Sequence, residues 1–387
     1  MSRSNLFGRR IHIAGSVSMD EGVASEVNVR RAREVISALV AELVVLGANF
    51  VIPVDAEKTR GDGLPICFDW LVWEAVSAHI AARPSGVPGP FIVAVKHHKN
   101  EEQIPPAYAD LWNAMRRSDL VEIESAAHWN MASKRMEGQA RHGDVLVTLG
   151  GGEGVLYLAN LYHDAGRPVV PLNFPLGPKD TGSLRLFSYG TSAAGAARLF
   201  QPAGNVPAQT LLNRIESHSK KLVDDEVRDI VALLNALDRP RAFVVRLLDP
   251  LHADFEAVEN YFSDVVRPVL EDSLGYRMTV VDGNQAFDHA RIDQDIFEKL
   301  HRSQLVVADI TGARPNCFIE LGYALGRALP TVLLARQDTQ HPFDVATYAG
   351  LHWTATGTPA DKQRALQNHW SAVRRRPAIV PTEPLIP

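Results

Sequence analysis

Three polar side chains in the last part of the chain have the types and spacing for chemistry on a sugar carbon. Asp309 follows an apolar run at residues 305–308, Asn316 ends a polar loop, and Glu320 lies in the first turns of a predicted helix. A second apolar run at residues 331–335 completes a strand–helix–strand pattern, which is typical of a parallel sheet. Ligands bind at the carboxyl ends of such strands. A carboxylate there can trap or stabilise a ribosyl cation, so we predict that Glu320, Asp309 and Asn316 form a catalytic site.

Each of these residues also has a simpler interpretation. Asp309 can serve only as a turn cap, Asn316 can cap the helix that carries Glu320, and Glu320 can be a surface residue. Arg246 and Asp249 follow the first apolar run of this half of the chain. A flavodoxin-like strand order would place them across a switch point from Glu320.

A second group of residues, rich in glycine, indicates a nucleotide-binding pocket in the first half of the chain. Its members follow two predicted strands and are Gly15, Ser16, Gly150, Gly151, Gly152, Glu153 and Gly154. Glycines let backbone N–H groups approach phosphate oxygens, and the N-terminus of the next helix favours negative charge. The spacing lacks the GxGxxG pattern of dinucleotide-binding folds. The alternative is that these glycines only form tight turns.

The pattern around these residues predicts two domains. Apolar runs alternate with helix-like segments over residues 1–200, which indicates an open parallel sheet covered on both faces. Residues 122–141 read as a helix within this domain. A charge-rich helical stretch at residues 201–239 reads as a connector, and a second series fills residues 240–387. The predicted fold class is α/β, with two Rossmann-like (flavodoxin-like) parallel-sheet domains joined by a helical connector.

Composition limits the classes of partner. The 387 residues carry a net charge of −5 and have a pI near 6.3, which gives no electrostatic case for binding nucleic acid or an anionic membrane. No apolar run approaches the roughly 20 residues that span a bilayer. The two cysteines are far apart, which favours a reducing compartment, so we expect a cytoplasmic protein. No Cys/His cluster has metal-ligand spacing, and we expect no metal site.

The second half resembles the nucleoside 2-deoxyribosyltransferase-like and TIR-like Rossmannoid domains of bacteria. The likeness rests on ADITG at residues 308–312, PN at 315–316 and ELGYA at 320–324, with flanking agreement at residues 243–250, 292–300 and 342–344. It implies N-glycosidic chemistry without a cofactor, in which NAD is the substrate and Glu320 acts on the ribosyl centre. We expect Arg246, Asp249 and Asp344 to bind the substrate.

The first half resembles the SLOG superfamily of nucleotide-binding Rossmannoids, which is related to lysine decarboxylase-like phosphoribohydrolases. The likeness rests on IAGS at residues 13–16 and TLGGGEG at residues 148–154, whereas residues 83–142 match poorly. The enzymatic branch has a Pro-Gly-Gly-x-Gly-Thr loop. That Pro and that Thr are missing here, which favours a ligand-sensing role over phosphoribohydrolase activity.

Together the two resemblances imply a bacterial antiviral defence effector. A nucleotide second messenger would bind the first domain, drive assembly of a homo-oligomer and switch on NAD cleavage in the second. Two alternatives stay open: a nucleoside 2-deoxyribosyltransferase, and a non-catalytic protein that binds nucleotides and signals. Release of nicotinamide from NAD would distinguish the NAD-cleaving effector from both of these alternatives.

Overall fold

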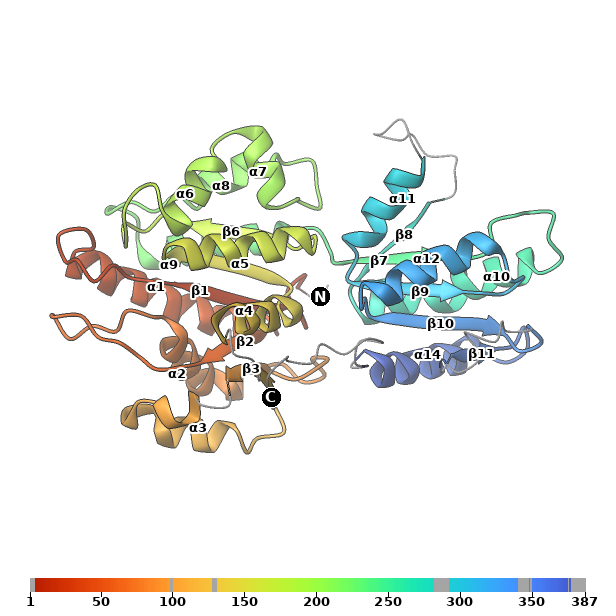
Figure 1. The fold of residues 1–387 in the computed structure, drawn as a ribbon, viewed down its shortest axis with the longest axis horizontal. Coiled ribbons are helices and arrows are strands. Elements are labelled where there is room, and N and C mark those ends of the chain that lie inside the picture. The colour runs from red at the N-terminus through yellow and green to blue at the C-terminus, as the bar shows by residue number, and fades with distance from the viewer. Residues whose placement is uncertain are drawn as a thin grey trace. The chain divides into compact units, whose positions relative to one another are not determined.

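Two parallel sheets organise the chain (Figure 1). The computed structural model describes residues 4–97, 100–126, 131–281, 292–339, 348, 350–374 and 376. The chain divides into two units between Asp238 and Arg239, and each unit contains one sheet. This confirms the predicted α/β class with two Rossmann-like parallel-sheet units. Among the described residues, no helix is both long enough and apolar enough to cross a membrane.

The first sheet has six strands in the order β4-β3-β2-β1-β5-β6, and all its strand pairs are parallel. The chain runs from central β1 outward to β4 and then crosses back to β5, so the switch point lies between β1 and β5. Ser16 and Gly150 are register partners there. The strands are β1 (Arg10–Ser16), β2 (Asn49–Val54), β3 (Ile92–His97), β4 (Val121–Ala126), β5 (Val145–Gly150) and β6 (Val169–Leu172).

Edge strand β4 departs from the prediction of a helix over residues 122–141. The structure pairs β4 in parallel with β3, and helix α4 (Met131–His142) begins only after it. Val121 and Ile123 alternate with Glu122 and Glu124 along β4. That two-residue period is typical of a strand with one polar face, so the helical reading of these residues is wrong.

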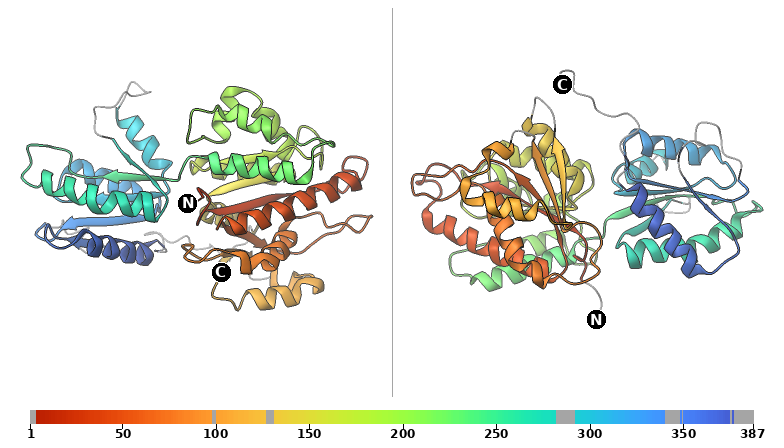
Figure 2. Two further views of the ribbon diagram at one scale, coloured as in Figure 1. Left: turned by 180° about the vertical axis from the view of Figure 1, so that it is seen from behind. Right: turned by 90° about the horizontal axis from the view of Figure 1, so that it is seen from below.

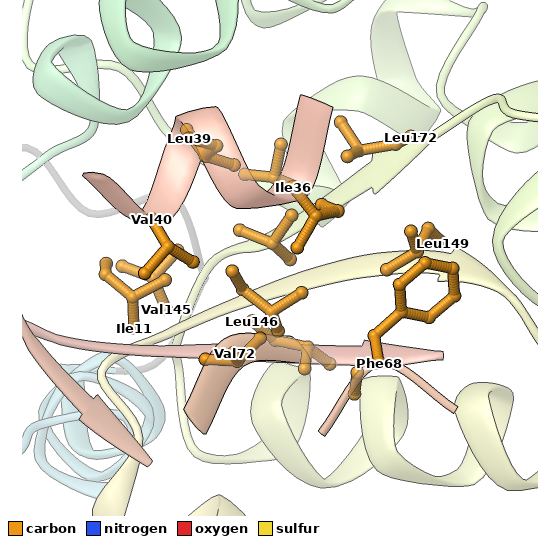
Figure 3. Close-up of a cluster of buried hydrophobic side chains, with 14 of the residues drawn as sticks. Ile11, Ile36, Leu39, Val40, Phe68, Val72, Val145, Leu146, Leu149 and Leu172 are labelled. Atoms are coloured by element: carbon orange, nitrogen blue, oxygen red, sulfur yellow. The ribbon is translucent and has the colours of Figure 1, made fainter. Parts of the chain in front are cut away.

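Helix α1 (Glu26–Val45) builds much of the core of the first unit. Its residues Ile36, Leu39 and Val40 have no exposed surface and lie in one apolar cluster with Ile11 of β1 and Leu146 of β5 (Figure 3). The other helices are α2 (Asp69–His79), α3 (Ala109–Met115), α5 (Glu153–Asp164), α6 (Gly182–Tyr189), α7 (Ala193–Leu199), α8 (Ala208–Arg214) and α9 (Val223–Ala236), with short 3-10 turns η1 (Ile80–Ala82), η2 (Asn100–Gln103) and η3 (Pro106–Tyr108).

Residues 201–238, most of the predicted connector, lie within the first unit, where α9 packs against α1. Arg31 of α1 forms an ion pair with buried Glu226 of α9, with 2.7 Å between Nη2 and Oε2. The apolar face of α9 joins the same core as the sheet. Its buried residues are Val227, Ile230, Leu233 and Leu234.

The second sheet has the strand order β11-β10-β9-β7-β8, all parallel, which is the flavodoxin-like order. Residues of β7 alternate between two apolar clusters on opposite faces, and Figure 2 shows helices on both sides. The elements are β7 (Arg241–Val245), α10 (Phe255–Tyr261), the π-helical turns η4 (Phe262–Val266) and η5 (Val269–Ser273), β8 (Arg277–Val280), α11 (Ile292–His301), β9 (Leu305–Asp309), α12 (Pro315–Gly326), β10 (Thr331–Arg336), β11 (Leu351–Trp353) and α14 (Pro359–Val373).

Ala328, just after the end of α12, has a φ of +54°, in the left-handed region that glycine adopts at no steric cost. We therefore expect Ala328→Gly to raise the free energy of unfolding of the second unit by about 1 kcal/mol. Thermal and denaturant unfolding of the intact chain would measure this change. The matched control is Ala365→Gly at an exposed position inside α14, which should lower stability by about 0.5–1 kcal/mol. Destabilisation by both substitutions would contradict the expectation.

Candidate functional site

Asp309, the last residue of β9, is a buried carboxylate with both oxygens hydrogen-bonded. Oδ1 accepts the backbone N–H of Thr311 at 2.8 Å, and Oδ2 accepts the indole N–H of Trp353 at 2.8 Å. Burial raises the pKa of Asp309, while the hydrogen bonds from Thr311 and Trp353 and the charge of Arg246 act in the opposite direction. In this geometry Asp309 positions the turn that leads into α12. A direct catalytic role for it stays a prediction.

The turn between β9 and α12 has an unusual backbone. Gly312 and Ala313 have φ values of +80° and +48°, and a residue other than glycine is uncommon there. Helix α12 begins at Pro315, and its N-cap is Arg314, without a side-chain cap hydrogen bond. Exposed Asn316 therefore lies inside the first turn, and the prediction that it caps the helix is wrong, because a cap precedes that turn. Its role in catalysis stays a prediction.

Glu320 lies one turn further along α12 and is half-buried. On its two sides, Ile319 is exposed and Leu321 is buried, so Glu320 lies at the rim between solvent and core. Burial raises the pKa of Glu320 to about 7. Among the described residues, its carboxylate makes no hydrogen bond or ion pair. These features distinguish it from an ordinary surface glutamate and are typical of functional carboxylates.

The loop after β7 brings further charged groups to the switch point between β7 and β9. Arg246 pairs with Glu259 at 2.5 Å between Nη1 and Oε2, and its guanidinium lies over the Phe262 ring, 5.3 Å from the centroid. The Oδ1 of Asp249 accepts a backbone N–H two residues further on, at 3.1 Å. The flavodoxin-like order therefore places both predicted substrate-binding residues beside the turn after β9. Asp344, the third, lies outside the described residues.

His252, which the sequence analysis missed, joins these two loops. Its Nδ1 accepts the backbone N–H of Asp254 at 3.1 Å, so the neutral ring carries its proton on Nε2. A Cβ added at Gly312 would lie 3.1 Å from that Nε2, so the ring rests on the turn after β9. Arg336, at the end of β10, pairs with Asp254. In the described ranges, no three His, Cys, Asp or Glu side chains are arranged to hold a metal ion.

In the first unit, tight packing explains several of the predicted nucleotide-binding glycines. A Cβ added at Gly15 would lie 1.8 Å from the Leu149 carbonyl oxygen, and one at Gly150 would lie 2.2 Å from the Ser16 carbonyl oxygen. Gly150 and Gly151 also have positive φ values of +55° and +71°. The Gly151 N–H donates to the Ser16 carbonyl at 2.7 Å. The turn-forming alternative therefore accounts for the glycines at these three positions.

The start of helix α5 is more open. Gly152 is the N-cap and has no side-chain cap hydrogen bond, and a Cβ added there would meet no atom within 4 Å. Glu153 and Gly154, the first residues of α5, are exposed. The first N–H groups of a helix have no partner within the helix and attract anions. Of the predicted nucleotide-binding residues, these three are best arranged to receive a phosphate group.

Comparison with known proteins identifies a family for the first unit. Residues 6–234, more than half of the chain, match the family described as ATP nucleosidase Cap17-like, N-terminal. No curated protein matches. A solved fungal multi-domain GH3 β-N-acetylglucosaminidase with a GCN5-related glucosamine N-acetyltransferase region aligns at 11% identity and a TM-score of 0.23, over 95% of this chain and 50% of that one. This chain thus spans about half that protein's length, and a likeness at this TM-score carries no argument.

The raised pKa of Glu320 makes a prediction about stability and pH. Because the folded state holds the proton more tightly, the free energy of unfolding should fall as pH rises from about 4.5 to about 7. Glutamine at position 320 carries no carboxyl that must ionise in a partly buried place. At pH 8 the free energy of unfolding of Glu320→Gln should therefore exceed that of the native protein by on the order of 1 kcal/mol, with solvent screening taken into account. The gain should shrink towards pH 5. Thermal unfolding across this range tests it. The matched control is Glu298→Gln on α11, whose carboxylate is paired with Arg302, and an equal gain there would contradict the assignment.

Proposed function

Through residues 6–234 the chain belongs to the family described as ATP nucleosidase Cap17-like, N-terminal, and from this assignment we propose that it breaks N-glycosidic bonds of nucleotides. In the proposal, the second unit is an NAD glycohydrolase and Glu320 is its catalytic carboxylate. The observation that carries the proposal is the half-buried Glu320 carboxylate, which has no hydrogen bond or ion pair among the described residues. It lies on the helix that follows β9, at the carboxyl edge of a flavodoxin-like sheet. The resemblance to TIR-like and 2-deoxyribosyltransferase-like domains supports the same chemistry.

Cleavage of NAD would use the negative charge of Glu320. As the bond between C1′ and nicotinamide breaks, its electron pair leaves with nicotinamide and the ribosyl carbon becomes positively charged. The ionised carboxylate would stabilise that carbon or trap it as an ester. Water then adds to C1′ and loses a proton, which gives ADP-ribose, nicotinamide and one proton. Electrostatic stabilisation of this kind typically contributes about 10²–10³-fold to the rate.

The groups around the turn after β9 suit the rest of such a substrate. Asn316 and Asp249 offer hydrogen-bonding groups for ribose hydroxyls, and we keep Asp344 as a predicted third contact. The Nε2–H of His252 and the guanidinium of Arg246 are donors that suit a diphosphate. Asp309 would act by holding the turn in place.

The first unit would act as a nucleotide sensor. The open start of α5 supports binding of a phosphate-bearing second messenger there. In the proposal, this ligand promotes a homo-oligomer in which the second unit cleaves NAD, as a cytoplasmic defence response. The ligand can shift the equilibrium only by binding the active form more tightly.

The family description also makes ATP a substrate to test. Nicotinamide released from NAD would identify a glycohydrolase, adenine released from ATP would identify an ATP nucleosidase, and base exchange between nucleosides would identify a 2-deoxyribosyltransferase. A protein that only binds and signals would release none of these products. One incubation with each substrate, read by chromatography, separates the four.

We expect Glu320→Gln to lower NAD cleavage by about 10²-fold or more, because a neutral amide cannot stabilise the ribosyl cation. In the native protein, the rate should rise as pH passes through about 7, since only the ionised carboxylate is active. Nicotinamide release measured between pH 5.5 and 8.5 tests both expectations. Glu298→Gln is the matched control and should retain activity. Full activity in Glu320→Gln would contradict the proposal that Glu320 is the catalytic carboxylate.

Gly152→Asp should weaken binding of ATP to the first unit by about tenfold or more, because it places a negative charge at the start of α5. A Cβ at this position would meet no atom within 4 Å, so the side chain would not clash with its surroundings. Calorimetry with ATP would measure the change. Gly204→Asp is the control, because Gly204 is also exposed and has open space. Equal affinity in the two variants would remove α5 as the phosphate site.

A further inference from the structure

A chain of three polar side chains joins α11 to α12, and the mechanism proposed above does not use it. The Tyr323 hydroxyl lies 2.6 Å from His301 Nδ1, and Nη2 of Arg327 lies 3.1 Å from His301 Nε2. His301 is the last residue of α11, Tyr323 lies within α12, and Arg327 is the C-cap of α12. The Phe297 ring of α11 packs against the Tyr323 ring, with 5.0 Å between the centroids. These contacts fix the position of the Tyr323 phenol.

The chemistry of the three groups gives both hydrogen bonds a direction. A guanidinium has N–H donors and no acceptor, so Arg327 donates and His301 Nε2 accepts. A ring protonated on both nitrogens could not accept from Arg327, so the imidazole is neutral. A neutral imidazole with an accepting Nε2 carries its proton on Nδ1. His301 Nδ1–H therefore donates to the hydroxyl oxygen of Tyr323.

The Tyr323 hydroxyl is the acceptor in this chain, so its own proton remains to be donated elsewhere. Among the described residues, that O–H has no acceptor, and the side chain is half-buried. Without Arg327, the imidazole could take its other tautomer, and the Tyr323 O–H would then donate to His301 Nδ1. Arg327 and His301 together thus keep the phenol available as a donor.

Tyr323 lies on the same face of α12 as the Glu320 carboxylate. Helix residues three or four apart are neighbours on one face, with about 5–6 Å between their Cβ atoms. Four polar residues of α12 and its C-cap follow one another at this spacing and form one stripe. They are Asn316, Glu320, Tyr323 and Arg327. Because helical side chains lean towards the N-terminus of their helix, the Tyr323 side chain leans towards Glu320.

We propose that the Tyr323 hydroxyl donates to the 2′-hydroxyl of the ribose held at Glu320, so that the site selects ribosyl over 2′-deoxyribosyl substrates. The inference rests on the cleavage at Glu320 that is proposed above. On a sugar whose C1′ faces the Glu320 carboxylate, C2′ and its hydroxyl are next to the reacting carbon. A donor one helical turn from that carboxylate is placed to reach this hydroxyl. His301 and Arg327 are positioning residues, because they act through Tyr323.

A contact with the 2′-hydroxyl would serve both rate and selectivity. In glycoside cleavage, hydrogen bonds to this hydroxyl strengthen as the sugar carbon becomes positively charged. A site that hydrogen-bonds a substrate hydroxyl also discriminates against an analogue without it, because the protein group is then left unpaired. The alternative is that the chain only fastens α11 to α12. Its loss would then affect all substrates alike.

The test compares cleavage of NAD with that of 2′-deoxy-NAD, in which the ribose next to nicotinamide lacks its 2′-hydroxyl. Tyr323→Phe should lower kcat/KM for NAD by about tenfold or more and leave kcat/KM for 2′-deoxy-NAD nearly unchanged. The preference for NAD would fall by the same factor, whereas equal losses with both substrates would overturn the inference. Tyr276→Phe is the matched control, because Tyr276 is a half-buried tyrosine that packs against Trp370 in the same unit.

Arg327 tests the direction of the hydrogen bonds. Arg327→Met removes the donor to His301 Nε2 and should reduce the preference for NAD, although Arg327 acts only through His301 and Tyr323. Arg327→Lys keeps a donor and should retain more of the preference. Thermal unfolding shows that each variant is folded. The full preference in a folded Arg327→Met protein would overturn the inference.

Failure of this inference can be told apart from failure of the proposed function. If NAD cleavage depends on Glu320 but Tyr323→Phe keeps the full preference, the inference is overturned and the glycohydrolase stands. If NAD is not cleaved, calorimetry measures its binding. Weaker binding of NAD to Tyr323→Phe, with unchanged binding of 2′-deoxy-NAD, would keep the contact with the 2′-hydroxyl and remove the glycohydrolase. Equal binding of NAD to Tyr323→Phe and to the native protein would overturn both.

Discussion

The two hydrogen bonds to Asp309 are the contact on which the site of the second unit depends. A carboxyl group without exposed surface is costly in a protein interior unless donors replace the lost water. The Thr311 N–H and the Trp353 indole provide those donors, and Trp353 is held in turn by stacking on Tyr261, with 4.4 Å between the ring centroids. The same contact ties the end of β9 to β11 and fixes where α12 starts. The position of Glu320 follows from it.

Asp309 and Glu320 show how one chemical group takes different roles. Asp309 has two donors and serves the structure. Glu320 is half-buried, and the described residues offer it no donor. Burial raises the pKa of both carboxyls, so the difference between them lies in the donors that each one has. In buried carboxylates, the missing partner is therefore the feature that points to chemistry.

Much of the fold could be predicted because strands of parallel sheets are apolar on both faces and appear as short continuous runs. The flavodoxin-like order, and with it the location of Arg246 and Asp249, followed from that pattern. Strand β4 was missed because it lies at a sheet edge, where glutamates are tolerated. His252 was missed for another reason: its significance comes from its contact with Gly312, which is distant in the sequence. Single-sequence patterns carry no information about such pairs.

The packing of α9 has a consequence for how such proteins are assembled from modules. The Asp238 N–H donates to the Gln201 carbonyl at 2.8 Å, and Pro202 forms an isolated β-bridge with Leu237. The two ends of the segment at residues 201–238 therefore contact each other within the first unit. A gene fusion that ended the first unit near residue 200 would separate α9 from α1 and expose the apolar core residues that α9 covers. A joint after Asp238 would leave that core covered. The stretch that must be inherited together therefore extends well beyond the predicted nucleotide-binding residues.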